Sequence, residues 1–346
     1  MLYWVIGLSV YALISTLLWA LFSYKARHIK HKLIQYAEAE QQSYQQKADQ
    51  AMHLNHTFQK FVPRQFVEHI AKQGASLELG HADEDNVAIL FCDIRGFTGL
   101  SERMKPQELM NFLNSYFIRM NAPIHDNKGF IDKFIGDAIM ALFDNPEGND
   151  SDKACDSIRA AIGLRRALYL YNQHRERSGY NSVNIGIGIH FGPVIIGTVG
   201  SDDRMDTTVI GDSVNIAQRL ESLAPIYDID IIVSDQLVQT TENAFASRVI
   251  DWVRVKGRSE PLKLVEVVEH LDDAEQSQRI ARAPAIQQGL DLRISGKLRE
   301  ALDVFKEAKK LSPTDPILKH HIKWTEHLIL HGVPENWDGT LQIGAE

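Results

Sequence analysis

The chain has little cysteine and no excess of positive charge. The first feature argues against a disulfide or zinc framework, and the second argues against a nucleic-acid partner. Cys92 and Cys155 are its only cysteines, and their spacing forms no disulfide or zinc framework. We therefore expect the main folded part of the chain in a reduced, cytoplasmic setting. The formal net charge is −8, so we expect no nucleic-acid partner. A length of 346 residues suits two or three parts rather than one small domain.

Charged side chains are also absent from residues 1–24, which are mostly aliphatic and aromatic. This run exceeds the roughly 20 residues that a membrane helix needs, and tryptophans lie near both ends. A cleaved signal peptide is the alternative, but no basic region precedes the apolar core. Basic residues follow at once, at Lys25, Arg27, Lys30 and Lys32. The pattern predicts a single-pass anchor in the inner membrane, with the N-terminus outside and the remaining chain in the cytoplasm. The lipid bilayer is thus a predicted partner.

Residues 25–83 are predicted to form a helical stalk and linker. From Ile34 to Phe58 the chain contains no glycine or proline. A weak heptad runs through this stretch, with Ala37, Tyr44, Ala51 and Phe58 alternating with Ile34, Gln41, Ala48 and Asn55. It favours a parallel two-stranded coiled coil, and a single solvated helix is the alternative. A hinge is expected around Pro63.

Two aspartates occupy the ends of predicted strands in the centre of the chain. Asp93 ends the apolar run 87–92, and Gly136-Asp137 interrupts a second run, 130–143, which reads as a hairpin. Either aspartate alone is more often turn chemistry than a catalytic group. A strand–helix–hairpin unit, however, brings both carboxylates together and suits a divalent metal with a polyphosphate. The residues after Ile94 lead into a helix and are expected to offer backbone N–H groups to the phosphates, chiefly Gly96, Phe97 and Thr98.

Residues 84–270 show a regular succession of predicted elements. The order is strand, helix, strand pair, helix, strand, hairpin arm, helix and closing strands. Helices are expected at 152–177 and 213–223, and a strongly alternating strand at 183–191. The succession predicts an α+β domain of ferredoxin-like type, with helices on one face of the sheet.

Five segments of this domain stand out as motifs. They read FCDIRGFTGLSE, IDKFIGDAIMALF, GIGIHFGPVIIGTVG, TTVIGDSVNIAQRLE and VKGRSEP. In this order and spacing they resemble the catalytic domain of class III adenylate and guanylate cyclases, over residues 86–270. The resemblance implies a phosphorus–oxygen lyase that converts a nucleoside triphosphate to its 3′,5′-cyclic monophosphate and pyrophosphate.

The resemblance also implies roles for individual residues. Asp93, Asp137 and the Ile94 carbonyl would bind two divalent ions per site, Mg²⁺ or Mn²⁺. The remaining roles are Asn215 and Arg219 at the transition state, Lys256 at the terminal phosphates, and Lys133 and Thr208 at the purine. In this family the metal residues come from one subunit and the others from its partner, so the resemblance implies a homodimer with shared sites.

The purine is predicted to be adenine, with ATP as substrate. Lys133 can donate to the unprotonated N1 of adenine but offers no acceptor to the N1–H of guanine. Thr208 stands where many adenylate cyclases carry Asp, and its hydroxyl can still accept from the adenine amino group. A guanylate cyclase is the alternative enzyme. A catalytically silent cyclase-like domain that senses nucleotide or acts as a scaffold is the alternative from another class.

Residues 271–346 are predicted as a separate helical region. Gly289, Ala301, Phe305, Ala308 and Pro313 fall at the offsets of one tetratricopeptide repeat. A single repeat cannot bury its own face, so we expect a helical hairpin packed on the catalytic domain or its partner. The adjacent His320 and His321 are expected on the solvated surface rather than in a metal site. A regulatory partner in the membrane or at these helices is left open.

Overall fold

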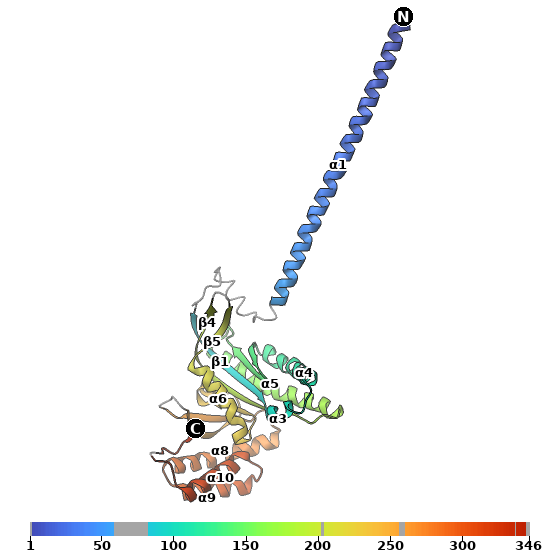
Figure 1. Ribbon diagram of the computed structural model, residues 1–346. Helices are drawn as coiled ribbons and strands as arrows, with labels where there is room; N and C mark the ends of the chain where they lie inside the picture. The colour runs from blue at the N-terminus through green and yellow to red at the C-terminus, as the bar shows by residue number, and fades with distance from the viewer. Residues whose placement is uncertain (1, 59–81, 202–203, 256–259, 336, 344–346) are drawn as a thin grey trace. The chain divides into compact units, whose positions relative to one another are not determined.

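The computed structural model describes residues 2–58, 82–201, 204–255, 260–335 and 337–343 (Figure 1). The chain divides into two compact units, residues 1–64 and 65–346. The predicted hinge around Pro63 lies outside the described residues.

The described residues of the first unit form one continuous helix, α1, from Leu2 to Phe58. It contains no proline, so nothing interrupts its backbone hydrogen bonds. Its described side chains between Leu13 and Leu54 are almost all exposed in the single chain, which fits a paired stalk and a solvated helix equally.

The structure does not support the membrane span predicted at residues 1–24. In the part of the chain that it describes, no helix carries an apolar stretch long enough to cross a membrane. The described side chains begin at Leu13, and the apolar run ends at Tyr24, before Lys25. The side chains of residues 1–12 lie outside the description.

The second unit is built on a nine-stranded sheet in the order β2-β3-β1-β4-β6-β8-β7-β9, with β5 paired to β4. Its strands are β1 Ala82–Ile94, β2 Phe130–Ile135, β3 Ala138–Phe143, β4 Ile185–Ser201, β5 Arg204–Ile210, β6 Ile231–Ser234, β7 Ser247–Val255, β8 Leu262–Val267 and β9 Leu341–Ile343. The central pair β1–β4 is antiparallel over the whole of β1, from Ala82↔Gly197 to Ile94↔Ile185. The predicted α+β character is confirmed.

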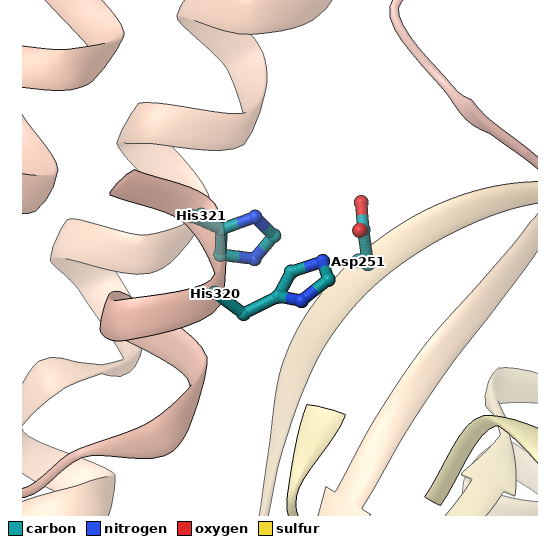
Figure 2. A group of neighbouring side chains, drawn as sticks. All are labelled: Asp251, His320 and His321. Carbon is teal, nitrogen blue, oxygen red and sulfur yellow. The ribbon is translucent and has the colours of Figure 1, made fainter. Parts of the chain in front are cut away.

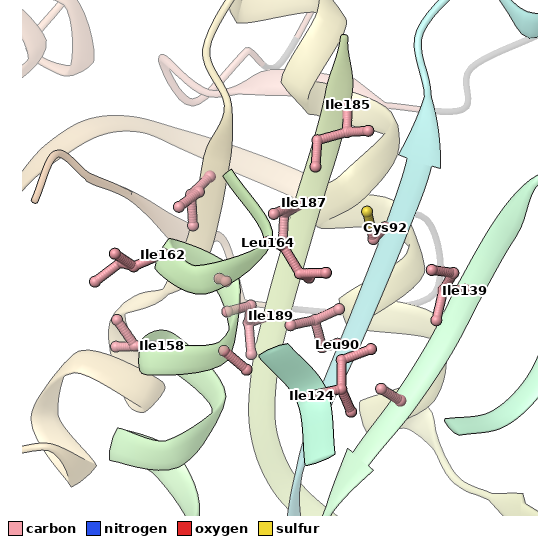
Figure 3. Close-up of a cluster of buried hydrophobic side chains, with 14 of the residues drawn as sticks. Leu90, Cys92, Ile124, Ile139, Ile158, Ile162, Leu164, Ile185, Ile187 and Ile189 are labelled. Carbon is pink, nitrogen blue, oxygen red and sulfur yellow. The ribbon is translucent and has the colours of Figure 1, made fainter. Parts of the chain in front are cut away.

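One helical layer covers the face formed by alternate residues of β1 and β4. It contains α3 (Phe97–Ser101), α4 (Pro106–Asp126), α5 (Asp150–Arg177) and α7 (Asp235–Thr240). Leu90, Cys92, Ile187 and Ile189 lie in the fully buried core between these strands and α4 and α5 (Figure 3). This layer agrees with the predicted helix at 152–177.

The prediction that helices cover only one face is wrong. Helix α6 (Asp212–Tyr227) packs on the opposite face, against the glycines that alternate with the buried isoleucines of β4. A Cβ on Gly188 would lie only 2.1 Å from the Glu221 backbone nitrogen. The α6 backbone therefore reaches the sheet only because these strand positions lack side chains.

The C-terminal helices share a core with α6 and the sheet, so the region predicted to be separate belongs to the second unit. The helices are α8 Asp273–Ile294, α9 Leu298–Leu311 and α10 Pro316–His331. The predicted hairpin is formed by α8 and α9, where a Cβ on Gly289 would lie 2.3 Å from the Phe305 ring. Phe305 is fully buried in a core that also contains Leu220 and Tyr227 of α6. The hairpin thus packs on the chain's own sheet.

Candidate functional site

Asp93 and Asp137 meet at one end of the sheet, as the sequence predicts. Strand β1 pairs with β3 through Cys92↔Ile139, which places the end of β1 beside the β2–β3 turn. Gly136 holds that turn with a φ of +65°, a conformation that favours glycine. The backbone N–H of Ile94 donates to Asp137 Oδ2 at 3.3 Å.

Among the described residues, no side-chain cation neutralises the two carboxylates. In the described part of the chain, no basic side chain forms an ion pair with either, and the buried Oδ1 of Asp93 has no hydrogen-bond partner. Burial raises the pKa of Asp137 to about 7, and the hydrogen bond and charge of Asp93 add to this effect. Arg95 follows closely in sequence but points away, toward Asp228 and Asp230.

Sequence reasoning missed a third carboxylate, Glu221 of α6. Its Oε1 would lie 3.1 Å from a Cβ on Gly186, and Gly186 is the register partner of Asp93 on β4. Burial raises the pKa of Glu221 to about 7, together with the charges of Asp93 and Asp137. The signal was present in the GIGIHF strand, whose alternate glycines admit a helix against the sheet.

This arrangement fits divalent cations. Oxygen ligands from carboxylates and a backbone carbonyl are those that Mg²⁺ and Mn²⁺ prefer. An unpaired carboxylate oxygen and a neighbouring carboxyl that resists ionisation show that negative charge is in excess at this end of the sheet. A bound cation would relieve both conditions.

The structure also brings the two predicted purine-facing residues together. Lys133 on β2 donates to the Thr208 hydroxyl on β5 at 2.9 Å, although 75 positions separate them. Lys133 also lies 3.4 Å from the Asp132 carboxylate. Alternation along β2 sends Phe134 to the other side, where it contacts the Phe117 ring at 4.2 Å between centroids.

The other predicted residues are placed as follows. Asn215 is exposed and Arg219 half-buried, both on α6 with one helical turn between them. Gly96, with a φ of +70°, precedes the five-residue helix α3, where Phe97 is half-buried and Thr98 exposed. Lys256 lies outside the described residues.

A second cluster, formed by Asp251, His320 and His321, has the composition of a metal site (Figure 2). Its position corrects the prediction of solvated histidines, because His321 is fully buried and His320 half-buried. The long-range packing of α10 on β7, which local sequence does not reveal, buries them.

This cluster already contains its cation. The fully buried Arg293 forms an ion pair with Asp251 and donates to His321 Nδ1 at 3.3 Å. The Tyr227 hydroxyl donates to Asp251 at 2.5 Å, and His321 Nε2 meets the Ile250 carbonyl at 2.7 Å. Burial alone would raise the pKa of Asp251, but the charge of Arg293 and the hydrogen bonds from Arg293 and Tyr227 hold it below its usual range. Burial lowers the pKa of His321 to about 4, so the ring is neutral. We assign this cluster a structural role.

Comparison with known proteins places the same region in context. Residues 79–267 match the family described as the adenylate and guanylate cyclase catalytic domain. The chain is 43% identical to an adenylate cyclase of Anabaena cylindrica over 219 residues, which cover 61% of this chain and 42% of that protein. It is 36% identical to the terminal-differentiation-specific adenylate cyclase of Dictyostelium discoideum over 266 residues, or 76% of this chain and 12% of that protein. The crystal structure of the adenylyl cyclase CyaB from P. aeruginosa superposes with a TM-score of 0.51 at 30% identity, over 56% of this chain and 97% of that chain. This chain therefore spans less than half the length of either full-length relative.

Proposed function

The chain belongs to the adenylate and guanylate cyclase catalytic domain family, and we propose that it converts ATP to 3′,5′-cyclic AMP and pyrophosphate. The observation that carries this proposal is that Asp93 and Asp137 meet at one sheet end and form no ion pair with a basic side chain that the structure describes. That is the charge arrangement a metal-dependent phosphoryl site requires. The two similar adenylate cyclases support the choice of reaction.

The reaction forms a bond between the ribose 3′-oxygen and the α-phosphorus and breaks the bond from that phosphorus to the bridging oxygen of pyrophosphate. The 3′-hydroxyl proton leaves to solvent. Asp93, Asp137 and the Ile94 carbonyl would hold two divalent ions, Mg²⁺ or Mn²⁺, which when bound neutralise the triphosphate and lower the pKa of the 3′-hydroxyl.

The protein's own groups act on the charge that moves. Arg219 offers a planar set of N–H donors to the oxygens of the α-phosphate as their charge rises. Asn215, four residues earlier on α6, lies on the same helix face and is proposed to orient the ribose. The backbone N–H groups at Gly96, Phe97 and Thr98 are proposed to donate to the terminal phosphates, together with Lys256.

We propose that two copies of the chain share each site. Exposed apolar side chains accompany the Lys133–Thr208 contact on β2, β4 and β5. They are Ile135, Ile195, Val199 and Ile210, each 41–50% exposed in the single chain. A cluster of this kind is typical of a surface that a partner covers, which supports the homodimer implied by the family.

The contact between Lys133 and Thr208 supports adenine as the base. The ammonium can donate to adenine N1 while the hydroxyl accepts from the exocyclic amino group. With guanine, the N1–H would face the N–H of the Lys133 ammonium. Both groups are donors, so neither would have an acceptor.

Incubating the purified full chain with ATP or GTP and Mg²⁺ or Mn²⁺ tests this function. Chromatography with mass detection should find cyclic AMP and pyrophosphate in equal amounts. Predominant cyclic GMP would establish the guanylate alternative. No cyclic product from a folded, nucleotide-binding dimer would establish the silent, sensing alternative.

Placement at the inner membrane, with residues 1–24 as the anchor and a paired stalk behind it, stays a prediction from sequence. Its support is the charge-free apolar run followed by basic residues. Fractionation of cells that express the full chain tests it, because an anchored chain stays in the membrane pellet after alkaline extraction. Recovery in the supernatant would contradict the anchor.

A further inference from the structure

A pocket between α4 and α5 lies apart from the candidate catalytic site. Its volume is about 340 Å³, within the range of sites that bind small molecules. Its lining includes Glu108, Phe112, Ser115, Tyr171, Arg175 and Tyr180. These helices cover the face of the sheet opposite α6, whereas Asp93 and Glu221 lie on the α6 side.

The pocket contains a buried arginine with unused donors. Arg175 is only 8% exposed, and its Nε donates to the Asn181 carbonyl at 2.8 Å. In the described residues, its two terminal nitrogens have no hydrogen-bond partner, and no carboxylate forms an ion pair with it. The Glu108 carboxylate, which also lines the pocket, accepts from the Lys105 backbone nitrogen at 3.1 Å.

Aromatic rings surround the guanidinium. Its central carbon lies 4.8 Å from the centroid of Phe112, 5.7 Å from that of Tyr171 and 5.5 Å from that of Tyr180. These rings hold Arg175 in position and give the pocket flat apolar walls. A guanidinium whose terminal donors are free is suited to a carboxylate, which it can bind through two parallel hydrogen bonds.

We propose that this pocket binds a small aromatic carboxylate, with the carboxylate on Arg175 and the ring against Phe112 and Tyr171. This inference does not depend on the proposed cyclase activity. The terminal nitrogens of Arg175 are accessible from the pocket and have no acceptor among the described residues, so an anionic ligand there can accept from both. The apolar walls account for the aromatic body of the ligand rather than a bare inorganic anion.

Calorimetric titration of the full chain with 2-naphthoate tests the proposal, with 2-naphthalenemethanol as an uncharged probe of the same shape. We expect saturable binding of naphthoate and binding of the alcohol at least about tenfold weaker. Arg175→Gln should weaken naphthoate binding by about ten- to a hundredfold. Arg177→Gln, which changes an exposed arginine on the same helix, should leave it unchanged.

A second variant makes the result independent of the folding of Arg175→Gln. Ser115 is exposed at the pocket wall, so Ser115→Trp fills the space and keeps Arg175. It should abolish naphthoate binding with little change in melting temperature. Absence of saturable binding to the wild type, or equal binding by the wild type and Ser115→Trp, would overturn the proposal and leave Arg175 as a purely structural group at the end of α5.

Discussion

The sheet end around Asp93 and the cluster around Asp251 both gather ionisable side chains away from water, and they balance charge in opposite ways. At the first, Asp93, Asp137 and Glu221 lie together, no basic side chain in the described residues forms an ion pair with them, and the pKa values of the last two are raised to about 7. At the second, Arg293 lies against Asp251 and holds the pKa of that carboxyl below its usual range.

The difference shows that ligand composition alone does not identify a metal site. The Asp251 cluster has the two histidines and one carboxylate that a metal prefers, yet each ligand atom of Asp251 and His321 already has a protein partner. The Asp93 end has only carboxylates, but its charge is unbalanced. Excess charge, rather than the type of residue, distinguishes the place where an ion is required.

The largest expected effect is on the cyclisation rate, after substitutions at the proposed catalytic site. Asp93→Ala and Arg219→Ala chains should each lose more than about a hundredfold of the cyclisation rate, since removing even outer groups around a metal costs up to that much. Mixed and allowed to exchange subunits, they should recover about a quarter of the wild-type rate, because half of the dimers are mixed and each holds one intact site. No recovery in demonstrated mixed dimers would show that each chain carries a complete site.

Substitutions in the Asp251 cluster should change the free energy of unfolding rather than the rate of cyclisation. Arg293→Met leaves Asp251 buried and unpaired, which should lower the free energy of unfolding by about 3–5 kcal/mol. Replacing Asp251 by Leu in the same chain should restore part of that loss. Urea unfolding measures both, with the exposed Arg299→Met as the matched control. A loss of activity without a loss of stability would instead make Arg293 part of the catalytic machinery.

A smaller effect is expected at the base pocket. Lys133→Glu removes the donor to adenine N1 and places an acceptor where guanine N1–H would lie. The ratio of kcat/KM for ATP to that for GTP should fall by roughly tenfold or more. The exposed Lys319→Glu serves as control. An unchanged ratio in the folded variant would assign Lys133 to its contact with Asp132 rather than to the purine.

The smallest effect is a pH dependence of stability. The folded pKa values of Asp137 and Glu221, about 7, exceed the reference values of 3.8 and 4.5. The folded chain therefore holds protons that the unfolded chain releases, so these groups make the metal-free protein less stable as the pH rises from about 4 to 7. The double variant Asp137→Asn, Glu221→Gln should gain more in melting temperature at pH 8 than at pH 5. An equal gain in melting temperature at both pH values would contradict the inference that negative charge is in excess around Asp93.

Local sequence signals predicted the elements around Asp93 and Asp137 well. The apolar run before Asp93 and the Gly136-Asp137 turn are short-range features, and the strand, hairpin and aspartate pair follow from them. Lys133 and Thr208, which the sequence groups at one site, lie in contact with each other, and their roles at the purine stay predictions. The resemblance to a known family, more than periodicity, identified the residues on α6.

The features that were missed depend on packing between distant segments. Placing α6 on the second face requires recognising that Gly186 and Gly188 leave room for a helix, and Glu221 follows from that placement. The burial of His321 depends on the packing of α10 against β7. Its contact there is the carbonyl of Ile250, 71 positions earlier in the chain. Nothing in the immediate neighbourhood of His320 and His321 indicates these contacts, so solvated histidines were the natural expectation.

Titration of the metal-free protein with Mn²⁺ at pH 8 tests the central claim most directly, with the free ion measured by electron paramagnetic resonance. The account predicts saturable binding that Asp93→Asn and Asp137→Asn each abolish and that His320→Gln leaves unchanged. Binding that survives both aspartate changes but is lost in His320→Gln would place the metal at the Asp251 cluster and contradict the account.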